Sequence, residues 1–355
     1  MRVLVINPGG TSTKIAVFDD SHQVFTTNID VDYDRVRHFA RVFDQLDFRS
    51  QQILDLLASQ GIALDSLDGV VGRGGLMKPL PGGTYQVCEA MVQDLENRIM
   101  GEHASNLGAP LALKIAQACG IPAYVVDPVA VDEFVPMARI SGLKELPRQS
   151  WMHALSQKAV CRTVAQQLGG SYEDYNFIVA HLGSGNSVAA HLKGAMVDGV
   201  GGRSDGPFSP ERPGGLQSYP LIQLCFSGKY SHRELVKKIS NEAGFYDYLG
   251  TKDMRLIEAR AAQGEAQASE VLEAYYYQVA QAIWSFGAIL HGQVDRVILT
   301  GGIAHSKQMV SRVSEYVARL APVEVIPGEL EMEALAAGAL RVLSHQEEAK
   351  DYTKV

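Results

Sequence analysis

The sequence predicts an α/β protein built from two related domains, and three observations support this fold class. Short apolar runs typical of buried strands alternate with amphipathic segments typical of helices along the 355 residues. A hairpin with a Gly/Ser/Thr-rich loop occurs twice, about half the chain apart, which indicates an internal duplication. The length also suits two domains of ordinary size, each with its own apolar core.

The two predicted hairpins share one design. In the first, apolar runs at 3–6 and 15–18 flank a loop that begins Asn7-Pro8-Gly9-Gly10. In the second, apolar runs at 177–180 and 188–190 flank a similar loop. Glycine and hydroxyl residues between two apolar runs are typical of a tight strand connection.

The rest of the chain alternates helices with strands. Periodicity predicts helices over residues 33–45, 49–60, 88–99, 105–119, 153–168, 231–242, 264–290, 305–319 and 331–344. Further short strands are expected at 68–71, 123–126, 296–299 and 323–326. Periodicity lapses near residues 147–150, so we expect an N-terminal domain over 1–149 and a C-terminal domain over 150–330. The helix at 331–344 is expected to complete the N-terminal domain.

Composition and charge exclude several classes of protein. With 32 basic and 40 acidic residues, the net charge is −8, which argues against a nucleic-acid partner. No apolar run approaches the ~20 residues of a membrane span. The four cysteines are scattered without a C-x-x-C pair, and the first strand begins at once, so we expect a reduced, cytoplasmic protein.

The glycine-rich loops suit phosphate binding. Glycine lets backbone amides approach a ligand closely, and hydroxyl and lysine side chains add donors. A plain hairpin turn is the alternative for each loop alone, but two copies and a third turn at Gly301-Gly302 favour a nucleotide. The P-loop, protein-kinase and dinucleotide fingerprints are all absent.

Three segments together carry a family resemblance: V-L-V-I-N-P-G-G-T-S-T-K at 3–14, V-A-H-L-G-S-G-N-S at 179–187 and L-T-G-G-I-A at 299–304. The set resembles the acetokinase family, within the superfamily of acetate and sugar kinases, heat-shock chaperones and actin. Segments 72–85, 101–109 and 205–212 look more like butyrate kinases than acetate kinases. The resemblance implies a duplicated ribonuclease H-like (actin-like ATPase) fold, with an active-site cleft between a carboxylate-side domain and a nucleotide-binding domain.

The resemblance also implies the nucleotide-binding residues, which would hold ATP or ADP. They are Asn7, Gly10, Thr11, Ser12, Lys14, His181, Gly183, Gly185, Asn186, Asp253, Arg255, Gly301 and Gly302. Read without the resemblance, the stretch around Asp253 and Arg255 is simply a capped helix N-terminus.

Four residues are expected to act in catalysis. Arg73 follows a strand in a glycine-rich loop, where a guanidinium can pair with a carboxylate or phosphoryl group; the alternative is a surface arginine. Arg212 matches the family less closely, and pairing with a nearby acidic residue is its alternative. His153 begins a segment resembling the catalytic histidine segment of acetate kinases, with Gln157 in place of a second histidine. Asp127 ends a buried strand.

The expected metal is Mg²⁺, because this ion needs few carboxylates and keeps several waters. Asp127 and Glu331 are the candidates that match the family. The alternative for Glu331 is that it only stabilises a helix N-terminus electrostatically.

The implied reaction is reversible, direct phosphoryl transfer from ATP to butanoate, giving ADP and butanoyl phosphate. A carboxylate is already ionised at neutral pH, so the lack of an obvious general base fits this acceptor. Acetate, propionate or a branched fatty acid is the alternative substrate. A non-catalytic, actin-like ATP-binding protein is the alternative from another class. The family also implies a homo-oligomer, a dimer or larger.

Overall fold

The computed structural model describes residues 1–31, 36–201 and 205–355. The chain forms two compact units, one of Met1–Asp132 with Leu330–Val355 and one of Glu133–Glu329. The division falls before the predicted boundary near 147–150, because Glu133 already bonds within the second unit, accepting a hydrogen bond from the Met196 amide at 2.7 Å. Within the described residues, no helix has the length and apolar character needed to cross a membrane.

The first unit contains a seven-stranded sheet in the order β12-β5-β6-β4-β1-β2-β3. The three consecutive strands β1, β2 and β3 pair antiparallel, β4 pairs parallel with β1, and β6 pairs parallel with β4. The strands are β1 (Arg2–Pro8), β2 (Ser12–Asp19), β3 (His22–Asp30), β4 (Gly69–Gly72), β5 (Thr84–Gln86), β6 (Ala123–Val126) and β12 (Lys350–Asp351).

The second unit repeats this plan in a five-stranded sheet ordered β11-β10-β7-β8-β9. Here β7, β8 and β9 pair antiparallel, β10 pairs parallel with β7, and β11 pairs parallel with β10. Both predicted hairpins are therefore confirmed, and so is the duplicated α/β fold. The strands are β7 (Asn176–His181), β8 (Ser187–Leu192), β9 (Ala195–Gly201), β10 (Arg296–Gly301) and β11 (Val323–Pro327).

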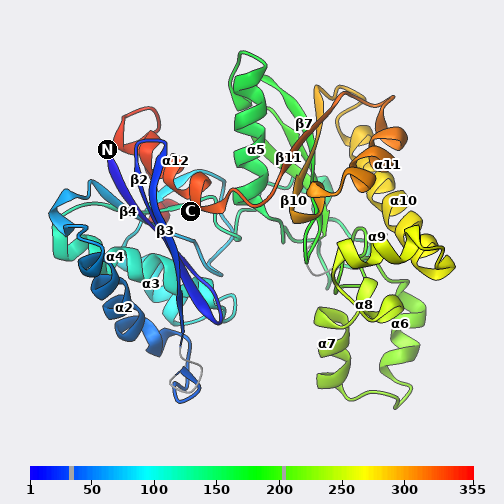
Figure 1. The fold of residues 1–355 in the computed structure, drawn as a ribbon, viewed down its shortest axis with the longest axis horizontal. Helices are drawn as coiled ribbons and strands as arrows, with labels where there is room; N and C mark the ends of the chain where they lie inside the picture. Colours follow the sequence, from blue (N-terminus) through cyan, green and yellow to red (C-terminus); the bar gives the residue numbers. More distant parts are fainter. Residues whose placement is uncertain (32–35, 202–204) are drawn as a thin grey trace. The chain divides into compact units, whose positions relative to one another are not determined.

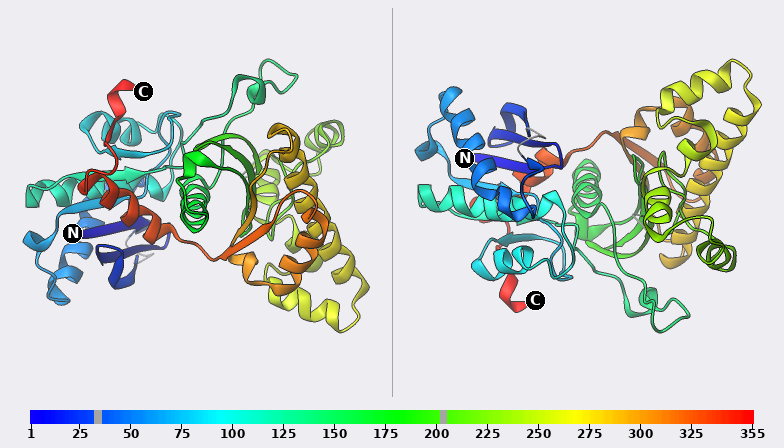
Figure 2. Two further views of the ribbon diagram at one scale, coloured as in Figure 1. Left: turned by 90° about the horizontal axis from the view of Figure 1, so that it is seen from above. Right: turned by 90° about the horizontal axis from the view of Figure 1, so that it is seen from below.

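Amphipathic helices cover the sheets. In the first unit, α4 and α12 pack against β1, β4 and β6. In the second unit, α5 packs against β7 and β10, while α10 packs against β7 and β8 on the other face (Figures 1 and 2). The helices include α2 (Leu46–Ser59), α3 (Glu89–Glu96), α4 (Gly108–Cys119), α5 (Ala154–Gln167), α6 (Ser218–Cys225), α7 (His232–Asn241), α8 (Phe245–Leu249), α9 (Met254–Ala262), α10 (Ala266–Ile289), α11 (Lys307–Val317) and α12 (Glu331–Leu343).

Some elements differ from the sequence prediction. The helix predicted over 33–45 falls partly on residues 32–35, which lie outside the described residues; of its remainder, Phe43–Gln45 forms a short 3-10 turn that leads into α2. Strand β3 was not predicted, because it is an edge strand with no fully buried residue and no apolar run.

Candidate active site

The first glycine loop joins β1 to β2. Asn7 pairs with Lys14 across the two strands, and the amide of Gly9 donates to the Ser12 carbonyl oxygen at 2.7 Å, which closes the turn. Gly10 and Thr11 are exposed at the tip. The five residues that we expected to bind phosphate therefore lie on one hairpin, as their spacing in the sequence requires.

Arg49, on α2, holds this loop through hydrogen bonds, and this role was not predicted from the sequence. Its guanidinium, only 1% exposed, donates to the Gly9 carbonyl at 2.9 Å, to Thr13 Oγ1 at 3.0 Å and to Gln45 Oε1 at 2.8 Å. Burial lowers the pKa of Arg49 below its usual value. An arginine in an amphipathic helix usually lies on the solvated face, so the sequence carried no signal for this role.

Arg73 and Asn7 meet at one carboxylate. Arg73 Nη1 forms an ion pair with Glu331 Oε1, and Asn7 Nδ2 donates to Glu331 Oε2 at 2.8 Å. Arg73 follows β4 and Asn7 lies near the end of β1, so the parallel pairing of these strands brings the two side chains to the same edge. Glu331 begins α12. Three predicted site residues from distant parts of the sequence are thus in contact.

The glycines around Arg73 are explained by close backbone packing. A Cβ on Gly72 would lie 2.1 Å from the Gly108 carbonyl oxygen, and one on Gly74 would lie 2.2 Å from Cβ of Pro128. These positions require glycine because the loop packs tightly on the start of α4 and on the turn after β6. The glycine-rich context of Arg73 is therefore a packing requirement of this loop.

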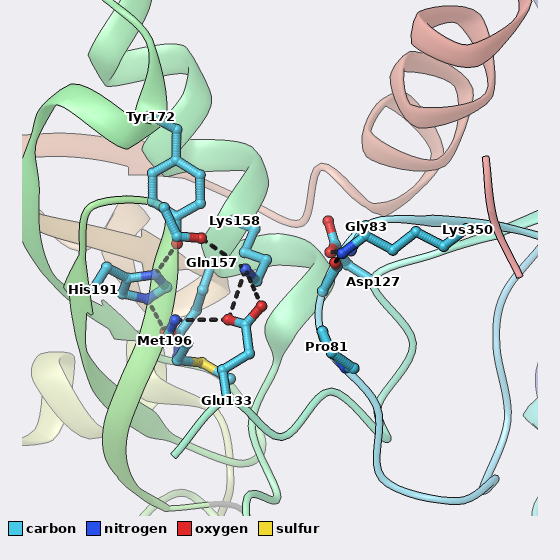
Figure 3. A network of polar contacts seen from close by, with 12 residues as sticks. Pro81, Gly83, Asp127, Glu133, Gln157, Lys158, Tyr172, His191, Met196 and Lys350 are labelled. Carbon is cyan, nitrogen blue, oxygen red and sulfur yellow. Dashed lines mark hydrogen bonds and ion pairs between the residues drawn. The ribbon is translucent and has the colours of Figure 1, made fainter. Parts of the chain in front are cut away.

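Asp127 is buried directly after β6. Its Oδ1 accepts a hydrogen bond from the Gly83 amide at 2.7 Å, and its own amide donates to the Gly83 carbonyl at 3.0 Å. The backbone has a φ of 37°, which is uncommon for a residue other than glycine. Figure 3 shows Asp127 beside Gly83 and Lys350, whose Nζ donates to the Gly82 carbonyl. The Asp127 carboxylate thus holds the Gly82-Gly83 turn.

The second glycine loop joins β7 to β8. Inside it, the Gly183 amide donates to Asn186 Oδ1 at 3.2 Å, and Asn186 Nδ2 donates to the Phe208 carbonyl at 2.7 Å. His181, at the end of β7, is 3% exposed and stacks on His153 with ring centroids 4.3 Å apart. The structure therefore brings the predicted catalytic histidine to the base of this loop.

Arg212 lies against the same loop. A Cβ on Gly185 would come within 2.4 Å of Arg212 Nη1, so glycine makes room for the guanidinium. Ser209 ties the segment to the loop, since its Oγ donates to the Ser184 carbonyl at 2.6 Å and accepts from the Arg212 amide at 3.2 Å. Glu211, the acidic residue next to Arg212 in the sequence, forms an ion pair with Lys252 at 2.7 Å.

The Gly301-Gly302 turn adjoins the second loop. Gly301 has a φ of 89°, and a Cβ there would lie 2.3 Å from the Leu182 carbonyl oxygen. The Leu182 amide in turn donates to the Thr300 carbonyl at 2.8 Å. The parallel pairing of β7 and β10 therefore places two of the three glycine turns side by side.

Asp253 and Arg255 form a helix cap. Asp253 accepts from the Arg255 amide at 3.0 Å and from Arg255 Nη2 at 2.9 Å. This hydrogen bonding lowers the pKa of Asp253 below its usual value. The Arg255 side chain is 90% exposed. These contacts match the plain interpretation of this stretch as a capped start of α9, and both side chains remain accessible.

Three loop glycines have no explanation in the protein itself. A Cβ on Gly10 or Gly302 would meet no described atom within 4 Å, and one on Gly183 would come no closer than 3.8 Å to any. None of the three has a positive φ. The open space leaves room for a ligand beside the backbone, and all three glycines lie on the turns predicted to bind phosphate.

The predicted magnesium ligands, Glu331 and Asp127, already accept hydrogen bonds within the protein. Among the residues that the structure describes, no three His, Cys, Asp or Glu side chains lie close enough to form a metal centre alone. Both oxygens of Glu331 already accept from Arg73 and Asn7. Carboxylate oxygens are hard donors of the kind that Mg²⁺ prefers, and this ion usually binds proteins through one or two carboxylates and retained waters.

Comparison with known proteins assigns the family. The model of the acetokinase family matches residues 143–347, more than half of the chain. The crystal structure of Porphyromonas gingivalis acetate kinase has a TM-score of 0.80 and 17% identity, covering 96% of this chain and 99% of that chain. Entamoeba histolytica acetate kinase has a TM-score of 0.78 and 16% identity, covering 96% of this chain and 99% of that chain.

A propionate kinase from Francisella tularensis has a TM-score of 0.72 and 19% identity, covering 95% of this chain and 98% of that chain. At these identities the solved structures establish the fold, which is the two-domain fold of the acetate and propionate kinases. The family match goes further than the fold. The chain belongs to the acetokinase family, whose members are kinases that phosphorylate a carboxyl group.

Proposed function

We propose that this protein transfers the γ-phosphoryl group of ATP to a short-chain fatty acid, with butyrate as the preferred acceptor. The observation that supports this most is that Arg73, Glu331 and Asn7 meet at the edge where β1 and β4 end. Under the proposal, the Arg73 guanidinium pairs there with the acceptor carboxylate. The narrower choice of butyrate rests on segments 72–85, 101–109 and 205–212, which resemble butyrate kinases.

The acceptor explains why no general base is needed. A short fatty acid has a pKa of about 4 to 5, close to that of a glutamate side chain, so its carboxyl group is already ionised at pH 7. The carboxylate oxygen attacks the γ-phosphorus in line, and the bond from phosphorus to the bridging oxygen of ADP breaks. The main obstacle is repulsion between two anions, which positive groups and orientation reduce.

Each site residue has a role in this proposal. Arg73 pairs with the carboxylate and orients its oxygen. Arg212, beside Gly185, neutralises charge on the phosphoryl group, and His153 donates a hydrogen bond to it. The amides of the second loop and of the Gly301-Gly302 turn hold ATP phosphates. Asn7, Gly10, Thr11, Ser12 and Lys14 on the first loop bind the transferring end of ATP, while Asp253 and Arg255 contact the nucleoside.

Glu331 and Asp127 would hold Mg²⁺ through its waters, and the bound ion would add positive charge close to the phosphates. Because butanoyl phosphate is a mixed anhydride, the reverse reaction that forms ATP also runs under the proposal. Acetate, propionate and branched acids are the alternative acceptors. A non-catalytic ATP-binding protein is disfavoured, because members of the acetokinase family are carboxylate kinases.

Replacing Arg73 tests the proposal. Arg73→Ala should lower kcat for butyrate by roughly 10²-fold, as expected for loss of one group that stabilises the transition state. Acyl phosphate is trapped with hydroxylamine and measured as the hydroxamate. Arg2→Ala is the matched control, because Arg2 lies at the opposite end of β1, pairs with Asp19 and has no role in the reaction. Equal hydroxamate yields from Arg73→Ala and the wild type would refute the assignment.

A further inference from the structure

A buried chain of hydrogen bonds lies behind the second glycine loop. Ser187 Oγ lies 2.8 Å from His153 Nδ1 and 2.8 Å from Gln157 Nε2. Gln157 Oε1 lies 2.9 Å from His191 Nε2, whose other ring nitrogen lies 2.6 Å from the Tyr172 hydroxyl. Gln157, Ser187 and His191 are fully buried, and Figure 3 shows His191 between Tyr172 and Gln157.

A backbone carbonyl sets the direction of this chain. Gln157 Nε2 lies 3.3 Å from the Ser187 carbonyl oxygen, which can only accept a hydrogen bond. The amide nitrogen of Gln157 must therefore face Ser187, since the opposite orientation would bring two acceptor oxygens together. It follows that Gln157 Oε1 faces His191 and accepts a hydrogen bond from the N–H group at His191 Nε2.

The same reasoning locates the hydroxyl proton of Ser187. Ser187 Oγ is approached by two donors, the Gln157 amide group at 2.8 Å and the His153 backbone amide at 3.5 Å. The acceptor among its described contacts is Nδ1 of His153, at 2.8 Å. The Ser187 hydroxyl therefore donates to Nδ1, and a neutral His153 ring carries its proton on Nε2.

The Tyr172 end of this chain of hydrogen bonds is consistent with the same direction. With its proton on Nε2, His191 accepts from the Tyr172 hydroxyl at Nδ1. The ammonium group of Lys158 lies 5.3 Å from the Tyr172 ring and pairs with Glu133 at 2.8 Å, so the buried charge near Tyr172 is also matched. A buried network in which each group has a partner holds one arrangement, because any reversal leaves a donor or acceptor unsatisfied.

Ring stacking disfavours a state in which both His153 and His181 are charged. His153 and His181 stack with centroids 4.3 Å apart and an interplanar angle of 22°. Two positive charges at this distance would repel each other strongly in a partly buried setting. Stacking thus disfavours two charged rings, and the Ser187 hydroxyl indicates that His153 is the neutral one.

We propose that Ser187 is a positioning residue that, with Gln157, fixes His153 as the neutral tautomer with its proton on Nε2. This inference rests on the proposed function, in which His153 donates to the transferring phosphoryl group. The fixed tautomer keeps Nε2 as the donor while Nδ1 stays occupied by Ser187. A histidine with its proton on Nδ1 would present a lone pair to the phosphoryl oxygens and repel them.

The tautomer is measured directly on the full-length protein labelled with ¹⁵N-histidine. Long-range ¹H–¹⁵N NMR assigns which ring nitrogen carries the proton, with His153→Gln identifying the resonances. The wild type should show a protonated Nε2 and an unprotonated Nδ1 shifted by an accepted hydrogen bond. Ser187→Ala should remove that shift. Ser50→Ala is the matched control, because Ser50 is also buried but its hydroxyl finds no partner among the described residues.

Kinetics supply a second readout. Ser187→Ala should lower kcat for acyl phosphate formation by about tenfold, as for loss of a group that orients a catalytic side chain, and should leave KM for ATP within about twofold. Ser50→Ala should leave both parameters unchanged.

Two outcomes would overturn the inference: a wild-type His153 with its proton on Nδ1, or an Nδ1 resonance that is the same in Ser187→Ala. The first needs only the wild-type protein, so it applies even if Ser187→Ala does not fold. Failure of the proposed function is a different result, in which the wild type forms no acyl phosphate although the NMR signature is present.

Discussion

At the scale of single residues, glycine has two distinct uses in this protein. Some glycines are required by the fold, as at Gly72 and Gly301, where a Cβ would meet a carbonyl oxygen at 2.1 and 2.3 Å. Others, such as Gly10 and Gly183, have no positive φ and have room for a Cβ. The sequence alone does not separate these uses, because close backbone packing arises only in the folded chain.

This distinction makes a testable prediction at two positions. Gly183→Ala should leave the free energy of unfolding within about 0.5 kcal/mol of wild type, since its Cβ meets no close atom. It should weaken ATP binding roughly tenfold by obstructing the approach of a phosphate. Gly301→Ala should destabilise the fold by roughly 2 kcal/mol or more, through a positive φ and a steric clash.

Urea unfolding and calorimetric titration with ATP separate the two effects. The account is contradicted if Gly183→Ala loses as much stability as Gly301→Ala, or binds ATP as tightly as the wild type.

At the scale of elements, the sequence predicted those with a buried stripe or a fully apolar run. Helix α10 was expected over 264–290 and extends over Ala266–Ile289, because its apolar side chains recur at helical spacing on one face. Strand β9 was missed because its sequence, Ala195–Gly201, contains an aspartate and two glycines, which are typical of turns. Its pairing with β8 is a tertiary effect that no local pattern reports.

Helix α12 offers a test of whether tight packing outweighs intrinsic helix propensity. Gly338 lies within α12, and a Cβ there would lie 2.4 Å from a methyl group of Val126 on β6. Helix propensity predicts that Gly338→Ala stabilises by about 1 kcal/mol. Overpacking costs roughly 1–3 kcal/mol, and the stiff valine side chain has little freedom to move, so we expect net destabilisation of about 1–2 kcal/mol.

Gly287→Ala in α10 is the matched control. Its Cβ would meet a terminal methyl group of Leu320 at 2.8 Å, and this flexible side chain can change rotamer. Urea unfolding should show Gly287→Ala close to wild type or more stable. If Gly338→Ala is also at least as stable as the wild type, the claim that α12 packs too tightly on β6 to admit a Cβ is refuted.

At the scale of the whole molecule, the duplication was visible in the sequence because its two hairpins keep the same polar loop. The remaining topology was not visible, since β5 and β12 are too short for any periodicity to reveal them. The site partners were equally hidden. Arg73 and Glu331 are 258 positions apart, and Asn7 and Glu331 are 324 apart. Resemblance to a family identified these residues, and only the fold of the first unit places them in contact.

The acyl-chain preference is also a property of the whole molecule, because the pocket for the chain is made by the fold. One methylene in an apolar pocket changes the transition-state free energy by ~1–3 kcal/mol. Butyrate has two more methylenes than acetate, so a pocket that fits butyrate should separate the two acids by at least about 30-fold in kcat/KM.

The most direct test is hydroxamate detection of acyl phosphate with ATP, Mg²⁺ and a series of linear and branched acids from two to six carbons. The account predicts acyl phosphate formation that depends on both ATP and the acid, with the highest kcat/KM for butyrate. A higher kcat/KM for acetate or propionate would contradict butyrate as the preferred acceptor. Absence of acyl phosphate with every acid would contradict the carboxylate kinase itself.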